Sequence, residues 1–273
     1  MVKRSYLDRY SDSIEVIALG NSHVLYGINP DVLTLKGFNA ANVSQSYNLD
    51  YELLMKYKSS WGQLKHIILP VDYFSFFMSL ESSDERWRLK NYEIYYDLNV
   101  GNDIASHTEM LSNNLSVNLK RLQKYYLGKE SNSFCSLQGW AKNYTTSATL
   151  TELTSSGVSR AQYHTSLSDI QYLKKNLNVM YSIIEFAKKR KIKILLYTSP
   201  CYKAYSQSLD QNQMNRSISQ ARDFENNFSN VTYVNFLNDS SFSAVDFFDG
   251  DHLNAMGATK LTSKIDSILA LPN

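Results

Sequence analysis

Five short apolar runs recur along the chain, and each has the pattern of a strand that is buried on both faces. Isoleucine, leucine and valine follow one another in these runs without the polar alternation of a half-exposed strand. Gly20 ends the first run, and Pro200 follows the fourth. The sequence therefore predicts strands at residues 14–19, 37–43, 65–71, 191–199 and 231–236.

Between these runs lie amphipathic patterns with a period close to 3.6 residues. The clearest runs from Leu173 to Ala187, and similar spacing covers residues 53–61, 214–228 and 258–268. Strands that alternate with helices form right-handed βαβ units, which predicts an α/β fold whose parallel sheet is covered on both faces. In such folds we expect the functional groups at the carboxyl ends of the strands.

The segment from about residue 80 to residue 163 breaks this alternation. It is rich in asparagine, serine and tyrosine, and a helical pattern lies at residues 118–125. We interpret it as a largely helical insertion in a single domain that spans residues 1–273, because one α/β domain can reach this length. Its aromatic side chains either pack in a core, as such rings usually do, or line a cleft for sugar rings.

Composition and charge narrow the classes of function. The 273 residues are 43% hydrophobic and 20% charged, which is the composition of a globular protein. A net charge of +2 lacks the basic excess of a nucleic-acid-binding surface, so we expect no nucleic-acid partner. The two cysteines, Cys135 and Cys201, follow no metal-ligand spacing, and we expect both to be reduced thiols.

No stretch of the sequence has the length and apolarity of a membrane-spanning helix. The longest apolar stretch, residues 67–78, is interrupted by Pro70 and Asp72 and is shorter than the ~20 residues that a span needs. The N-terminus lacks the apolar core of a secretory signal, although residues 3–13 would suit a stretch just outside a membrane anchor. The localisation stays open between a cytoplasmic protein and the anchor-less part of a bacterial envelope protein.

Two polar clusters have the residue types of a hydrolytic site. A Gly-Asn-Ser-His cluster directly follows the first predicted strand, and an Asp-Gly-Asp-His cluster precedes the last predicted helix. A serine hydroxyl becomes a nucleophile when an imidazole takes its proton, and a carboxylate orients that imidazole. We therefore expect Ser22, His252 and Asp249 to form a catalytic triad. Asp251 is the alternative carboxylate, but adjacent residues of an extended loop point apart, so we expect Asp251 to be solvated.

Other roles remain open for the same residues. Ser22 could cap the helix that follows the first strand, and His23 could form a structural hydrogen bond instead of touching a substrate. A metal site built from the imidazoles and carboxylates of both clusters would leave Ser22 without a role. Val24 stands where the elbow of the α/β-hydrolase fold has a glycine, which disfavours that fold.

The two clusters resemble sequence blocks of the SGNH, or GDSL-like, hydrolase superfamily. Gly-Asn-Ser is similar to the first block, Gly-Asp-Ser, with Asn21 in place of the aspartate. Asp249 and His252 match the fourth block, Asp-x-x-His. The resemblance implies a three-layer, flavodoxin-like SGNH fold with the sheet order 2-1-3-4-5 and Ser22 as the nucleophile.

The second and third blocks are matched less closely. Residues 39–46 resemble the second block, Asn-x-Gly-x-x-Gly, whose last glycine falls on Ser44. The resemblance therefore implies that the backbone N–H groups of Ser22 and Ser44 bind the oxyanion. The third block, Gly-x-Asn-Asp, lacks its asparagine, and Asp72 takes that place. Loss of this donor would cost ~10²-fold in rate unless Asn42 or Asn48 replaces it.

Four residues near the blocks are candidate substrate contacts, namely Asn21, His23, Asn42 and Asp72. The blocks look most like those of the branch associated with O-acyl transfer onto cell-surface polysaccharides, including alginate O-acetylation and teichoic-acid D-alanylation proteins. This resemblance implies an O-acetyltransferase that acts on a bacterial surface polysaccharide through an acyl-enzyme. The alternatives are a carbohydrate acetylesterase and an inert glycan-binding domain.

The resemblance also implies the partners of such an enzyme. The substrate would be a carbohydrate or another acylated small molecule, and a membrane-bound protein could supply the acyl group. We expect neither a cofactor nor a catalytic metal, because a serine triad needs none.

Overall fold

A five-stranded parallel sheet forms the centre of the computed structural model, which describes residues 2–100 and 134–271. The strands lie in the order β2-β1-β3-β4-β5, so the predicted fold class and strand order are confirmed. Their bounds are β1 (Val16–Ala18), β2 (Gly37–Asn39), β3 (His66–Pro70), β4 (Lys193–Thr198) and β5 (Val231–Asn235).

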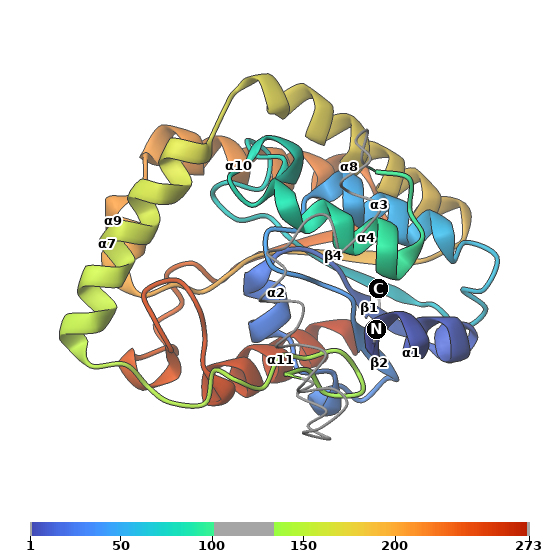
Figure 1. Cartoon of the computed structure of the whole chain (residues 1–273), viewed down its shortest axis with the longest axis horizontal. Helices are drawn as coiled ribbons and strands as arrows, with labels where there is room; N and C mark the ends of the chain where they lie inside the picture. Colours follow the sequence, from blue (N-terminus) through green and yellow to red (C-terminus); the bar gives the residue numbers. More distant parts are fainter. Residues whose placement is uncertain (1, 101–133, 272–273) are drawn as a thin grey trace, which may run out of the picture.

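Helices cover both faces of this sheet (Figure 1). On one face lie α1 (Val2–Tyr10), α3 (Tyr47–Lys56), α4 (Leu89–Tyr96), α8 (Gln171–Lys189) and α10 (Gln211–Asn227). On the other lie α2 (Ser22–Gly27) and α11 (Ala255–Leu269).

Successive strand residues pack into different layers, because side chains alternate between the two faces of a strand. In β1, Ile17 belongs to the core beneath α3 and α8, whereas Val16 and Ala18 belong to the core beneath α2 and α11. Both layers are apolar, which explains why the strands read as continuous hydrophobic runs.

Two further helices lie at one end of the sheet. They are α7 (Leu150–Leu167) and α9 (Lys203–Ser208), which pack against each other (Figure 1). Helix α7 begins with a capping box, in which Thr149 and Glu152 bond each other's backbone N–H groups. Since α7 continues past residue 163, the end of the predicted insertion falls inside this helix.

Some predicted elements differ from the observed ones. Helix α3 ends at Lys56, and Trp61 packs beyond it with its indole N–H donating to the backbone oxygen of Leu54 at 3.0 Å. Helix α1, whose Leu7 is buried, was not predicted. The helical pattern at residues 118–125 lies outside the described residues. In the part of the chain that the structure describes, no helix is both long enough and apolar enough to cross a membrane.

Candidate active site

The turn between β1 and α2 places Ser22 at the carboxyl edge of the sheet. Gly20 has φ +122°, and a Cβ atom there would lie 2.5 Å from Cδ of Pro70. Only glycine allows this turn so close to the end of β3. Asn21 then caps α2, since its Oδ1 accepts the backbone N–H of His23 at 2.9 Å. Ser22 is therefore the first residue of a capped helix.

The loop that carries His252 is held by its own polar groups. Oδ1 of Asp249 accepts the backbone N–H groups of Asp251 and His252 at 3.0 and 2.8 Å. Asn254 caps α11 by accepting the backbone N–H groups of Met256 and Gly257. These hydrogen bonds fix both ends of the loop independently of any contact made by the imidazole of His252.

The structure brings the three residues of the expected triad together. Nε2 of His252 lies 2.9 Å from Oγ of Ser22. On the other side of the ring, Nδ1 of His252 lies 3.0 Å from Oδ2 and 3.1 Å from Oδ1 of Asp249. The order hydroxyl, imidazole, carboxylate is the one that proton transfer from a serine requires.

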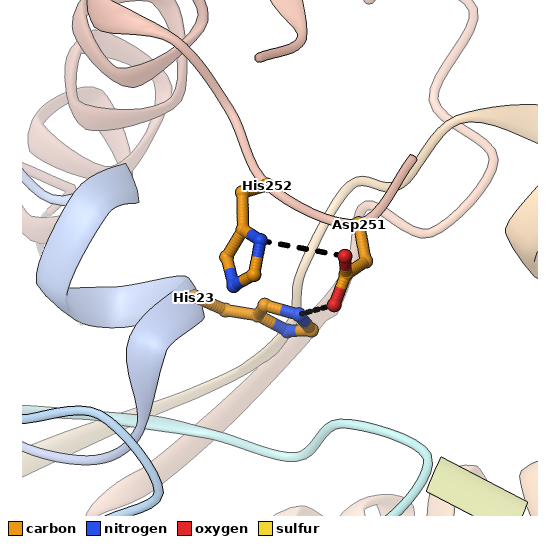
Figure 2. A group of neighbouring side chains, drawn as sticks. All are labelled: His23, Asp251 and His252. Atoms are coloured by element: carbon orange, nitrogen blue, oxygen red, sulfur yellow. Dashed lines mark hydrogen bonds and ion pairs between the residues drawn. The ribbon is translucent and has the colours of Figure 1, made fainter. Parts of the chain in front are cut away.

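Asp251 is not solvated, so that expectation is wrong. Its side chain is 0% exposed, and its Oδ1 lies 3.3 Å from Nδ1 of His252. Its Oδ2 lies 3.4 Å from Nε2 of His23 (Figure 2). The same oxygen lies 3.3 Å from Nε of Arg160. We expected neighbouring residues of an extended loop to point apart. The bonds from Asp249 to the backbone bend this loop, and Asp251 turns inward.

His23 lies between two carboxylates. Its Nδ1 forms an ion pair of 3.0 Å with Oδ2 of Asp72, and its Nε2 faces Asp251. Burial by itself would lower the pKa of His23, but the charges of Asp72 and Asp251 outweigh it and raise this pKa to about 10. The charge of His23 in turn keeps the pKa of Asp72 below its usual value despite burial.

The same groups could be considered as metal ligands. His23, Asp251 and His252 each offer one ligand atom, and these atoms lie within 4.8 Å of one another. A histidine ligand needs a nitrogen without a proton. Both nitrogens of His23 face carboxylates, which favours the doubly protonated ring. These residues therefore fit a proton and charge network better than a metal site.

The pKa of His252 is raised. Burial acts to lower it, but the charge of Asp251, followed by the hydrogen bond to Asp249, outweighs burial. His164 behaves in the opposite way, because burial lowers its pKa to about 3. The pKa values of these two buried histidines are therefore shifted in opposite directions.

A cavity of about 300 Å³ opens beside Ser22 and His252. Its wall also contains polar and aromatic side chains that we did not predict, namely Glu85, Arg88, Tyr144, Arg160, Tyr163 and His164. All but His164 belong to the predicted insertion, and His164 follows it directly. The capping box at Thr149 was a sequence signal for α7, the helix that carries Arg160, Tyr163 and His164.

The remaining predicted site residues take different places. Asn21 and Ser44 line the cavity. Ser44 has φ 58°, a conformation that suits the glycine of the family block, and its hydroxyl bonds the carboxylate of Glu85. Among the described residues, neither His23 nor Asp72 is part of the cavity wall.

Neither asparagine considered as a replacement donor is among the described residues that line the cavity beside Ser22. Nδ2 of Asn42 donates to Oε1 of Gln45 at 2.8 Å, and Asn42 lines a neighbouring cavity. Nδ2 of Asn48 donates to Oε1 of Glu81 at 3.3 Å.

The carboxylate of Asp72, which was expected in the place of the third-block asparagine, is held by other groups of the protein. Its Oδ2 accepts from Nδ2 of Asn21 at 3.0 Å, and its Oδ1 accepts the backbone N–H of Ser199 at 3.1 Å. With His23 on the same carboxylate, its charge is neutralised within the protein.

Comparison with known proteins gives distant structural likenesses. No protein-family model matches the chain, and no curated protein matches its sequence. A Streptococcus pneumonia protein described by the term platelet activating factor is similar, with a TM-score of 0.46 and 12% identity over 98% of this chain and 91% of the other.

Two Bacteroides proteins are similar at about the same level. A Bacteroides fragilis protein assigned as an acylhydrolase has a TM-score of 0.42 and 11% identity over 96% of this chain and 95% of its own. A GDSL-like lipase of Bacteroides thetaiotaomicron has a TM-score of 0.41 and 10% identity over 98% of this chain and 97% of its own. Because the identities are this low and the TM-scores lie below 0.5, we infer the function from the geometry of the site itself.

Proposed function

We propose that the protein is a serine-dependent acyl-transfer enzyme with Ser22, His252 and Asp249 as its catalytic triad. The observation that supports this most is the 2.9 Å contact between Oγ of Ser22 and Nε2 of His252, with Asp249 on the far nitrogen. A serine that merely capped α2 would need neither partner. The cap is already supplied by Asn21.

The chemistry proceeds in two balanced steps. Oγ of Ser22 attacks an ester carbonyl while its proton passes to Nε2 of His252, and the oxyanion is bound by the N–H groups of Ser22 and Ser44. The carbon–oxygen bond of the ester breaks, and His252 returns the proton to the leaving alcohol. Water or a sugar hydroxyl then loses its proton to His252 and attacks the acyl-serine. The bond between the acyl carbon and Oγ of Ser22 breaks, His252 returns the proton to Oγ, and the acid or the acylated sugar is released.

The site contacts of Asp72 bear on the inert alternative. A carboxylate in place of the third-block asparagine cannot donate to the oxyanion unless it is protonated, which was the reason to consider an inert protein. The Asp72 carboxylate instead bonds Asn21, His23 and the backbone of Ser199. In the proposed reaction the oxyanion therefore depends on two backbone donors, those of Ser22 and Ser44.

For the substrate we propose a carbohydrate. The favoured reaction is acetyl transfer onto a hydroxyl group of a bacterial surface polysaccharide, and the alternative is hydrolysis of an acetylated carbohydrate. Tyr163 offers a ring for a sugar face, and Arg88 and Arg160 offer donors for hydroxyl or carboxylate groups. The resemblance to the branch that acylates surface polysaccharides supports the same class. A membrane-bound acyl-donor protein would be its partner.

The test compares two acceptors for one acetyl group. The enzyme receives p-nitrophenyl acetate with and without cellohexaose or a mannuronate oligomer, and both p-nitrophenol and acetylated oligosaccharide are measured. A transferase yields acetylated oligosaccharide, whereas an esterase yields only acetate and also deacetylates acetylated oligosaccharides. Ser22→Ala should lose either activity, and Ser206→Ala on α9 is the matched control. Equal rates for the wild type and Ser22→Ala would contradict the proposal.

A further inference from the structure

The Nδ1 side of His252 carries more negative charge than a general base tolerates. Asp249 and Asp251 both lie within 3.3 Å of this nitrogen. A general base must be neutral before it accepts a proton, and two carboxylates stabilise the protonated ring instead. A site that uses His252 as a base therefore needs a positive charge close to these carboxylates.

His23 supplies such a charge from behind the cavity wall. Its side chain is 2% exposed, and its ring lies edge-on to that of His252 with 5.2 Å between centroids. Asp72 on one nitrogen and Asp251 on the other hold the ring as an imidazolium (Figure 2 shows the Asp251 side). The three groups form a chain of alternating charge that ends at the catalytic imidazole.

We propose that His23 is a positioning residue that acts on His252 through Asp251, holding this carboxylate beside Nδ1 while its own positive charge offsets it. The proposal rests on the proposed function, since it concerns the base of that reaction. His23 itself does not contact the cavity in which a substrate would bind.

Other charged groups also face this network. Arg160 of α7 is the second cation on Asp251, at 3.3 Å, and its guanidinium also lies 3.3 Å from Nε2 of His164. Because arginine can only donate, His164 accepts there and its Nδ1–H donates to the hydroxyl of Tyr205 at 2.7 Å. His164 is therefore neutral and adds no charge.

The groups around His252 complete the environment. The rings of Tyr26 and Tyr144 both lie edge-on to the imidazole of His252, with 5.5 and 5.7 Å between ring centroids. The Cys201 thiol, which follows β4, lies 3.9 Å from the backbone oxygen of Asp251, and burial raises the pKa of this thiol. Arg160 is more exposed than His23, at 36% against 2% for the side chains, so solvent screens its charge more strongly.

The first test measures the protonation of the histidines in the wild-type protein. In protein labelled with ¹⁵N-histidine, long-range ¹H–¹⁵N spectra report the protons on each ring nitrogen from about pH 5 to about pH 10. Single substitutions assign the five histidines. We expect both nitrogens of His23 to stay protonated through neutral pH while His252 titrates. A neutral His23 ring at pH 7 would overturn the proposal.

The second test replaces His23 with glutamine, which removes the cation and keeps a polar side chain. The pKa of His252 should rise by about one unit or more. The acid limb of kcat/KM for p-nitrophenyl acetate should move to higher pH by the same amount, with most of the rate recovered at alkaline pH. A purely structural role would lower the rate at every pH. An unchanged His252 titration in folded His23→Gln would also overturn the proposal.

His66→Gln is the matched control. His66 is also a buried histidine, but it is the first residue of β3 and so lies at the amino ends of the strands, away from Ser22 and His252. Its replacement should leave the His252 titration unchanged. A wild-type protein without serine-dependent activity would contradict the proposed function. Normal activity in a protein whose His23 is neutral would contradict only the role given to His23.

Discussion

The two carboxylates at His252 differ in their surroundings and therefore in their expected effects. Asp249 is 25% exposed at the side chain and bonds both Nδ1 and the loop backbone. Asp251 is fully buried, and its pKa lies well below the usual value because of His252, His23 and Arg160, which outweigh burial. Asp249 thus orients the imidazole, while Asp251 mainly sets its charge.

Replacing each aspartate by asparagine should separate these effects. Asp249→Asn should lower kcat by about 10²-fold. This loss is smaller than the ~10⁴-fold seen when the carboxylate of a triad is replaced and no second one is present, because Asp251 still faces Nδ1 of His252. Asp251→Asn should lower the pKa of His252, because the charge of Asp251 is the main influence that raises it. The acid limb of the pH profile of kcat/KM then moves to lower pH. The opposite shift in Asp251→Asn would show that this carboxylate does not face the base.

At the scale of elements, the His252 loop is positioned by direct backbone contact with α7. A Cβ atom on Gly250 would lie 2.2 Å from both Cα and N of Gly157. The N–H of Gly250 also donates to Oγ of Ser156 on the same helix at 2.9 Å. The helix and the loop can come this close only because residue 250 is glycine. A Cβ atom on Gly157 would instead lie 2.9 Å from the backbone nitrogen of Tyr205 on α9.

Gly250→Ala should therefore move the loop away from α7. We expect a loss of about 1–3 kcal/mol in the free energy of unfolding. The value of kcat/KM should fall by at least about 10-fold, since small displacements of a catalytic group are costly. Denaturant unfolding and p-nitrophenyl acetate hydrolysis measure the two effects. Gly62→Ala, where the nearest atom would be Asp12 O at 3.3 Å, is the control. Wild-type activity in Gly250→Ala would show that this contact does not position His252.

The size and spacing of the buried side chains explain which elements could be predicted from the sequence. The strands and α8 have large apolar side chains in regular patterns, and both were found. The buried face of α7 includes Leu153, Gly157 and Ala161, whose mostly small side chains give a weak hydrophobic period. The helix was therefore missed, and with it Arg160 and His164.

At the scale of the whole molecule, the sheet brings together groups from distant parts of the chain. Ser22 follows β1, Asp72 follows β3, and His252 precedes α11. The block pattern predicted the juxtaposition of Ser22 and His252, because parallel strands end at one edge. It did not predict the buried network behind them, since the ion pairs of His23 and Asp251 depend on the bend of a loop and on α7.

This buried network should make stability depend on pH. The pKa of His23 is about 10 in the folded protein and near 6.5 when unfolded. A pKa raised by folding adds stability that is complete below the unfolded value and is lost as pH rises through the folded value. The stability difference between the wild type and His23→Gln should therefore shrink from about pH 6.5 to about pH 10, by up to ~1.4 kcal/mol per pH unit.

Denaturant unfolding of both proteins at several pH values measures this difference. Comparing the two cancels other groups that titrate in the same range, such as Lys3, whose pKa burial lowers to about 8. A difference that stays constant over the range would mean that His23 does not carry a proton in the folded state at neutral pH.

The most direct measurement of serine chemistry is the mass of the intact protein after treatment with a fluorophosphonate, followed by peptide mapping. An activated serine reacts with this reagent, whereas a hydroxyl that only caps a helix does not. We predict one adduct, located on the peptide that contains Ser22, with none in Ser22→Ala and normal labelling in Ser206→Ala. An unlabelled wild-type protein, or an adduct that persists in Ser22→Ala, would contradict the assignment of Ser22 as the nucleophile.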